Sequence, residues 1–177
     1  MRTRELKIPD VFLVENVTHS DNRGELAVVW DKFLSCSAGP DFSPTSALLS
    51  YNTQSGTLRG LHYQQTPHDQ SKLVACASGK IWDVIVDLRR NSNTYMAWLA
   101  IELSYDSGES VFIPPGCAHG FITLEDNTTV SYLIEGEYIA TAAKAIRWDD
   151  PQLAINWPVH DPILSERDSS APYLSQL

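Results

Sequence analysis

Short runs of apolar residues recur along the chain, and turn-forming residues separate them. Between Ile81 and Leu88 the even positions hold Trp, Val, Val and Leu, whereas Asp83 and Asp87 occupy odd positions. A period of two is typical of a β-strand, because successive side chains point to opposite faces. Further runs of β type lie at residues 11–17, 25–30, 45–52, 71–77, 94–104, 110–113, 120–124 and 129–134. The pattern therefore predicts an all-β protein built from many short strands.

The segments between these runs indicate how the strands connect. D-N-R-G at 21–24 and Ser78-Gly79 are turn signals between neighbouring runs. Many short antiparallel strands with Gly and Pro turns favour a sandwich or a barrel, and a jelly roll fits this length. From Trp148 onward, W-D-D-P and N-W-P indicate an irregular tail with short helices at most. No repeat or linker divides the sequence, so residues 1–177 are expected to form one domain.

The net charge of the chain disfavours some kinds of binding partner. The chain has 13 Lys and Arg against 22 Asp and Glu, which gives a net charge of −9. Nucleic acids and anionic membranes attract clustered positive charge, so neither is expected as a partner. A small phosphate site built from a few well-placed cations is still compatible with that charge.

The cysteines and the N-terminal residues indicate where in the cell the protein is expected. Cys36, Cys76 and Cys117 are odd in number and have no C-x-x-C spacing, which is typical of reduced thiols. The first residues, M-R-T-R-E-L-K-I-P-D, lack the apolar core of a signal peptide, and no run reaches about 18 apolar residues. We therefore expect a cytoplasmic protein without a membrane segment.

Catalytic motifs with a strong sequence signature are missing from the chain. The histidines lie at positions 19, 62, 68, 119 and 160 and include no H-x-H pair, so a metal site is not expected. The sequence has no G-x-S-x-G nucleophile motif and no glycine-rich phosphate loop. General acid–base chemistry is the class that remains.

Five polar residues are candidates for such chemistry. The stretch T-L-R-G-L-H-Y-Q places His62 between leucine and tyrosine, with Arg59 three residues upstream. Strand alternation puts Lys72 and Tyr132 on apolar faces, which point to the inside of a barrel. A buried His or Tyr is commonly a hydrogen-bonded core residue, but a lysine is rarely inward unless it is paired. Lys72 therefore indicates an anion or a developing negative charge nearby, and Asp168 could orient a histidine.

Longer motifs occur in a fixed order along nearly the whole chain. They are D-N-R-G, S-Y-N-T-Q-S-G-T-L-R-G-L-H-Y-Q, Q-S-K-L-V, G-K-I-W-D-V-I-V-D-L-R-R-N-S-N-T-Y, I-P-P-G-C-A-H-G-F, Y-L-I-E-G-E-Y, I-R-W-D-D-P, I-N-W-P and L-S-E-R-D. In this order they resemble the dTDP-4-dehydrorhamnose 3,5-epimerase family, whose members are cupin-like jelly rolls that use no metal. G-T-L-R-G-L-H-Y-Q and P-P-G-C-A-H-G-F are the most specific of these elements.

The resemblance implies an activity and an assembly. The expected reaction is epimerisation at C3, at C5 or at both carbons of a nucleotide-linked 4-keto-6-deoxyhexose, in deoxysugar biosynthesis. No cofactor is expected, because the ketone of the substrate serves as the electron sink. The expected assembly is a homodimer that forms by exchange of N-terminal strands.

The resemblance also implies roles for individual residues. The family's catalytic positions are matched by His62 as general base, Asp168 as the carboxylate that orients it, Lys72 as the group that steadies the enolate, and Tyr132 as the general acid on the opposite face. Its substrate-binding positions are matched by Arg23, Arg59 and His119 at the nucleotide diphosphate, Tyr138 near the base or sugar, and Arg167, which replaces a common lysine.

The chain departs from the family pattern at several positions. The usual Y-x-P-x-x-E-R-G-I-R-W is Y-I-A-T-A-A-K-A-I-R-W here, with Ala140 and Ala143 in place of the proline and glutamate. Val28 stands where many members have a carboxylate, and Leu133 where lysine is frequent. S-Y-N replaces the Q-x-N of the best-known thymidine-nucleotide members, so the nucleobase stays open.

Three alternatives follow from the same residues. A C3-only epimerase would result if the phenol of Tyr132 is tilted away from C5. A 3,4-ketoisomerase is less favoured, because those relatives tend to pair two nearby histidines. A non-catalytic sugar-nucleotide binding protein is the alternative outside enzymes, but binding alone needs no acid–base pair on opposite faces.

Overall fold

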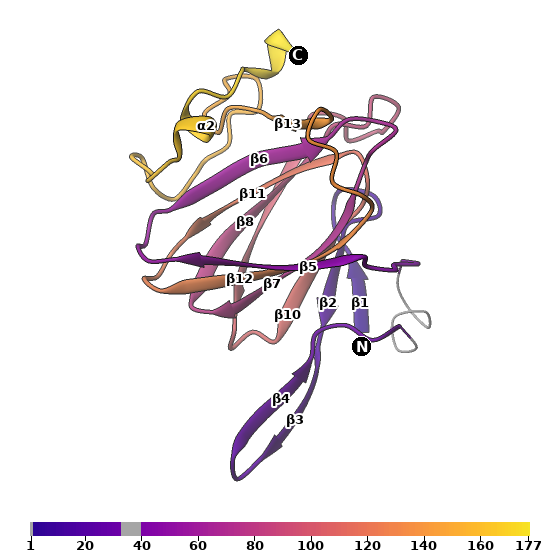
Figure 1. The fold of residues 1–177 in the computed structure, drawn as a ribbon, viewed down its shortest axis with the longest axis vertical. Coiled ribbons are helices and arrows are strands. Elements are labelled where there is room, and N and C mark those ends of the chain that lie inside the picture. Colours follow the sequence, from indigo (N-terminus) through magenta and orange to yellow (C-terminus); the bar gives the residue numbers. More distant parts are fainter. Residues whose placement is uncertain (1, 33–39) are drawn as a thin grey trace.

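Antiparallel β-strands are the main regular elements of the computed structural model, which describes residues 2–32 and 40–177 (Figure 1). The strands, in chain order, are β1 (Arg2–Glu5), β2 (Phe12–Glu15), β3 (Val17–Asp21), β4 (Gly24–Val28), β5 (Ser46–Asn52), β6 (Leu58–Gln64), β7 (Ser71–Ser78), β8 (Lys80–Asp87), β9 (Trp98–Ser104), β10 (Glu109–Ile113), β11 (Cys117–Thr123), β12 (Thr128–Glu135) and β13 (Ala143–Ala145). The short helices α2 (Glu166–Ser169) and η1 (Leu174–Gln176), the latter a 3-10 helix, lie in the C-terminal tail.

Two sheets face each other to form a jelly roll. One has the order β1-β2-β10-β7-β12-β5, and the other has the order β13-β6-β11-β8-β9. Strands β3 and β4 form a separate two-stranded hairpin, which projects away from the body in Figure 1. The prediction of an all-β jelly roll with short helices near the C-terminus is confirmed.

Strand β8 illustrates why the sequence folds in this way. Its odd positions Ile81 and Ile85 lie in the core between the sheets, whereas the even positions Val84 and Val86 pack in a second cluster outside the five-stranded sheet. Both faces of β8 are therefore covered by apolar side chains. The odd position between Ile81 and Ile85 is Asp83, which is fully buried with them. A charged residue thus lies inside the jelly roll.

The C-terminal tail covers the outer face of the five-stranded sheet. The indole Nε1 of Trp98 donates to the carbonyl of Leu153 at 2.9 Å, and that of Trp157 donates to the carbonyl of Trp148 at 2.8 Å. The ring of Trp157 also lies 5.3 Å from the ring of Trp82 on β8. These contacts hold an otherwise irregular segment in place, and this segment carries α2 back to strand β6.

Within the described ranges, no helix is long and apolar enough to cross a membrane. Cys76 and Cys117 are buried free thiols, and Cys36 lies outside the described residues.

Candidate active site

A backbone irregularity brings Arg59 and His62 to the same face of β6. Phe121 pairs with Arg59 and His119 pairs with His62, so the register between β6 and β11 shifts by one residue between these pairs. Gly60 lies at this shift with φ +133°, and a Cβ atom there would lie 2.5 Å from the Cα of Gly120. Only glycine fits such a close approach of two backbones. Residues three apart, which regular alternation would separate, therefore both face the space between the sheets.

His62 forms a short hydrogen bond with a carboxylate from the tail. Its Nε2 lies 2.7 Å from Oδ1 of Asp168, and 37% of the His62 side chain is exposed against 5% of Asp168. Burial alone would raise the pKa of Asp168, but the hydrogen bond and charge of His62, the backbone N–H of Gly60 and a hydrogen bond from Ser165 together lower it. The carboxylate thus stays ionised beside an accessible imidazole, whose Nδ1 is left to take a proton.

A second histidine–carboxylate pair lies directly beside the first. His119 is the cross-strand neighbour of His62, and its Nε2 lies 2.7 Å from Oδ2 of Asp83. Both side chains are almost completely buried. Burial raises the pKa of Asp83, and the interaction and hydrogen bond with His119, together with the charge of Lys72, offset part of that rise. In the sequence Asp83 stood out only as a polar position in a strand, so the pairing of Asp83 with His119 was not predicted.

Lys72 and Tyr132 come from the opposite, six-stranded sheet. Burial lowers the pKa of Lys72 to about 8, although Asp83 and Cys117 partly counter the effect. Burial and the charge of Asp83 raise the pKa of Tyr132, and the charge of Arg59 lowers it less. The Tyr132 ring lies 6.1 Å from the ring of His119. The sheets therefore place imidazoles on one side of the interior and an ammonium and a phenol on the other.

Of the two arginines predicted to contact the diphosphate, Arg59 is the one that lies beside this interior. Its Nε donates to Oδ1 of Asn52 at 2.8 Å, while the side chain as a whole is exposed. The charge of Arg59 also acts on the Tyr132 phenol. A phosphate held by Arg59 would therefore lie at the edge of the space that Tyr132 lines.

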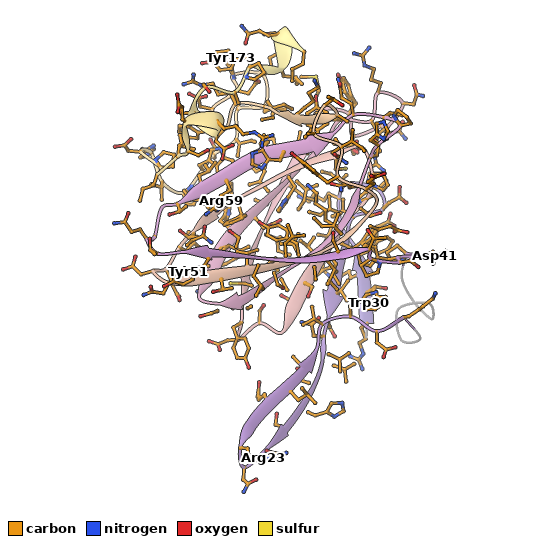
Figure 2. All side chains as sticks on the ribbon, viewed as in Figure 1. Arg23, Trp30, Asp41, Tyr51, Arg59 and Tyr173 are labelled. Carbon is orange, nitrogen blue, oxygen red and sulfur yellow. The ribbon has the colours of Figure 1, made fainter. Side chains whose placement is uncertain are left out.

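Arg23 lies far from the other candidates within this chain. Figure 2 shows it at the tip of the β3–β4 hairpin, at the opposite end of the molecule from Tyr173. Its side chain is 85% exposed, and its Nη2 lies 2.6 Å from Oδ2 of Asp21. The structure therefore does not bring Arg23 together with the Arg59 or His62 of the same chain.

Tyr138 and Arg167 lie near the rim of the site. Tyr138 is 64% exposed, in the loop between β12 and β13. That loop is fastened to β6 because the side chain of Gln64 donates to the carbonyl of Glu137 at 2.9 Å and accepts from the N–H of Ile139 at 2.7 Å. Arg167 is exposed in α2, next to Asp168.

The departures from the family pattern fall in different places. Ala143 pairs with Gln64, and Ala145 pairs with His62, so small side chains flank the histidine on its β13 side. Leu133 packs instead against a third cluster, with Leu73 and Phe112, and Val28 lies on the hairpin. Ala143, which replaces the usual glutamate, therefore lies on the strand next to the candidate base, two residues from the position that pairs with it.

Over the part of the chain that the structure describes, no three His, Cys, Asp or Glu residues gather so as to hold a metal ion. The groups that do gather suit proton transfer. An imidazole can take a proton from a carbon acid, a nearby ammonium can stabilise the resulting oxyanion, and a phenol on the other side can return a proton.

Comparison with known proteins assigns this chain to a family. The sequence profile of dTDP-4-dehydrorhamnose 3,5-epimerase matches residues 5–176. A dTDP-4-dehydrorhamnose 3,5-epimerase from Sinorhizobium fredii is 39% identical over 178 residues, which span 100% of this chain and 91% of the relative.

Solved structures agree with the sequence match. The dTDP-4-dehydrorhamnose 3,5-epimerase of Bacillus anthracis, with TDP and PPi bound, gives a TM-score of 0.95 at 38% identity, covering 98% of this chain and 99% of that one. A 3′-monoepimerase from Streptomyces bikiniensis, in complex with dTDP-quinovose, gives a TM-score of 0.89 at 31% identity and covers 99% of this chain and 88% of that one. The chain therefore belongs to the dTDP-4-dehydrorhamnose 3,5-epimerase family.

Proposed function

We propose that the protein epimerises a nucleotide-linked 4-keto-6-deoxyhexose at C3, at C5 or at both carbons. The observation that carries the proposal is the opposition of the His62–Asp168 pair on one sheet to Lys72 and Tyr132 on the other. Inversion at a carbon needs a proton to leave one face and another to arrive on the opposite face. A binding protein has no need of this arrangement.

The pKa shifts of Lys72 and Tyr132 support the roles proposed for them. The 4-keto group acidifies the C–H bonds at C3 and C5, and His62, oriented by Asp168, takes the proton. The ammonium of Lys72, with a pKa of about 8, is charged at neutral pH and stabilises the enolate oxygen. The raised pKa of Tyr132 keeps its phenol protonated, so it can donate to the carbon from the other side. The substrate ketone is the electron sink, so the proposed mechanism uses no cofactor.

Arg59 and His119 are proposed to bind the nucleotide diphosphate, with Tyr138 and Arg167 at the rim. The exposed guanidinium of Arg59 supports this assignment, as does the related Bacillus anthracis enzyme with its bound TDP and PPi. The nucleobase is proposed to be thymine by the same likeness. Loss of the Arg59 charge should weaken the binding of dTDP, which calorimetry would measure.

We further propose a homodimer in which Arg23 serves the site of the partner subunit. Two features support it: the β3–β4 hairpin extends away from its own chain, and Leu26 on that hairpin is 67% exposed. Sedimentation should give twice the mass of one chain. Mixed dimers of Arg23→Ala and His62→Ala chains should recover activity, because one site then contains both an intact His62 and an intact Arg23. Mixtures as inactive as either parent would argue against shared sites.

The test of the reaction is deuterium incorporation followed by NMR. In heavy water, dTDP-4-keto-6-deoxyglucose should acquire deuterium at C3, at C5 or at both. Incorporation at C3 alone would select the single-centre alternative, which is the activity of the related 3′-monoepimerase. Binding without any exchange, with several nucleotides tested, would leave the non-catalytic alternative.

Residues 1–177 are proposed to act as one domain, and the cytoplasm is the proposed location. The buried free thiols Cys76 and Cys117 are compatible with a reducing compartment. Cell fractionation would test the location.

A further inference from the structure

Asn52 lies at the end of β5, and both the amide nitrogen and the amide oxygen of its side chain form hydrogen bonds. The residue is 2% exposed. Its Nδ2 donates to the carbonyl of Ser50 at 3.0 Å and to the carbonyl of Thr128 at 3.2 Å, which uses both N–H bonds of the amide. Its Oδ1 accepts from Nε of Arg59 at 2.8 Å. The reversed amide would set an oxygen against two carbonyls, so this network admits one orientation.

The frame that holds Asn52 is rigid. Asn52 pairs with Thr128 at the start of β12, and Thr128 is fully buried, with its hydroxyl bonded to the carbonyl of Glu125 at 2.8 Å. Arg59 belongs to the other sheet. The Asn52–Arg59 hydrogen bond therefore ties the two sheets together beside the space that Tyr132 lines.

The bond to Asn52 fixes Arg59 without neutralising it. A guanidinium has five N–H donors in one plane, so engaging Nε fixes that plane and leaves the four donors on Nη1 and Nη2. Arg23, Arg89 and Arg147 each pair with an aspartate. Arg59 instead contacts a neutral amide and forms no ion pair within residues 2–32 and 40–177. A fully charged, oriented fork is what bidentate recognition of a phosphate requires.

We propose that Asn52 is a positioning residue for the diphosphate of the substrate. It holds the guanidinium of Arg59 in one plane, with its charge intact and its Nη edge presented to the nucleoside diphosphate. The inference rests on the proposed function, in which Arg59 binds that group.

A double-mutant cycle with dTDP as the calorimetric probe tests the proposal. Arg59→Ala should weaken binding by about 100-fold, since it removes charge-assisted hydrogen bonds. Asn52→Ala should weaken binding by about tenfold, because the arginine stays but loses its orientation. In the double variant the loss should equal that of Arg59→Ala alone, because Asn52 acts through Arg59. In kinetics Asn52→Ala should raise KM more than it lowers kcat.

Tyr51→Phe is the matched control. Tyr51 is the neighbour of Asn52, its side chain is 59% exposed, and its hydroxyl bonds Asn127 at 2.7 Å. Its loss should leave dTDP affinity unchanged. If Asn52→Ala does not fold, Asn52→Ser carries the test, because its hydroxyl can still donate to a neighbouring carbonyl but is too short to replace the amide oxygen that accepts from Nε of Arg59. Its affinity for dTDP should fall by a similar factor.

The outcomes separate this inference from the proposed function. If Arg59→Ala binds dTDP as tightly as wild type, the proposed diphosphate site is wrong. If Arg59→Ala loses affinity but Asn52→Ala and Asn52→Ser do not, or if the two losses simply add, Asn52 does not act through Arg59 and this inference alone fails.

Discussion

The two histidine–aspartate pairs of this protein have the same contact distance but lie in different surroundings. Both place Nε2 at 2.7 Å from a carboxylate oxygen, and their histidines are cross-strand neighbours. His62 is 37% exposed and His119 only 5%. The carboxylate beside His62 has its pKa lowered, whereas the carboxylate beside His119 has its pKa raised. The two pairs therefore differ in their access to solvent and in the direction of the carboxylate pKa shift, although their contact distance is the same.

The difference arises from what else each carboxylate touches. Asp168 receives hydrogen bonds from the backbone of Gly60 and from Ser165 in addition to His62, which favours its charged form. Asp83 is enclosed in the core, and its Oδ1 has no hydrogen-bond partner among the described residues. His119 and Lys72 lower the pKa of Asp83, but burial outweighs them and the net shift is upward. The surroundings of Asp168 thus favour its charged form, which suits its proposed role of orienting His62, whereas the surroundings of Asp83 disfavour its charged form.

Among variants of the residues around His119, Tyr132→Phe should cause the largest loss of epimerase activity. The change keeps the ring that packs near His119 but removes the proton donor. Net epimerisation should fall by roughly 100-fold or more, whereas exchange at C3 should fall less, because His62 can return a proton on its own face. If the phenol were only structural, the loss would be about 1 kcal/mol of stability with turnover nearly intact. Turnover, exchange and melting temperature measured on one preparation distinguish the two.

Lys72 should give activity and stability opposite dependences on pH. Its folded pKa of about 8 lies below the ordinary 10.5. The ammonium is needed for the enolate, so activity should decline as pH rises through about 8. The buried charge costs stability below that pH, and this cost is relieved as pH rises from 8 toward 10.5, where the unfolded chain holds more protons.

A pH series of kcat and of unfolding free energy would check both slopes. Lys72→Arg is the control, because a guanidinium stays charged across this range and any residual activity should lack the basic limb. A basic limb that persists unchanged in this variant would assign the limb to another group.

Asp168→Asn should have a smaller effect on stability, about 1–3 kcal/mol at neutral pH, because a charged hydrogen bond is lost. Since the folded pKa of Asp168 is lowered, its contribution is complete above the ordinary value near 3.8 and is lost as pH falls through the folded pKa. The variant should therefore show a flatter loss of stability in acid than wild type does.

Asp83→Asn should instead show a steeper loss of stability in acid than wild type does, because the folded pKa of Asp83 is raised. Urea unfolding at several pH values would compare the two variants. Equal acid slopes in both would contradict the distinction between the pairs.

Part of this comparison could be predicted from the sequence. Period-two alternation located the strands, and it correctly turned Lys72 and Tyr132 toward the interior. Alternation gave no sign that the aspartate-bearing face of β8 is buried, because burial of that face depends on a second sheet that the strand itself does not encode. His119, the partner of Asp83, is 36 residues away, and only the register of β8 against β11 brings the two together.

The site also depends on a break in the alternation. A regular strand would put Arg59 and His62 on opposite faces, and Gly60 is the one sequence sign of the irregularity that joins them. Arg23 matched a motif, yet the chain leaves it at the hairpin tip, where only an assembly could bring it to a site. Asn52 carried no signal beyond its place in S-Y-N, because its role depends on contacts with backbone carbonyls.

The central claim is that His62, and not His119, moves the proton. The most direct test compares deuterium exchange into the substrate by His62→Ala and His119→Ala at saturating substrate. His62→Ala should show no exchange at C3 or C5 and should lose product formation by at least about 100-fold. His119→Ala should retain exchange once enough substrate is supplied, because it is proposed to bind the diphosphate and not to move the proton. A folded His62→Ala protein that exchanges at near wild-type rate, or the reverse ranking of the two variants, would contradict the account.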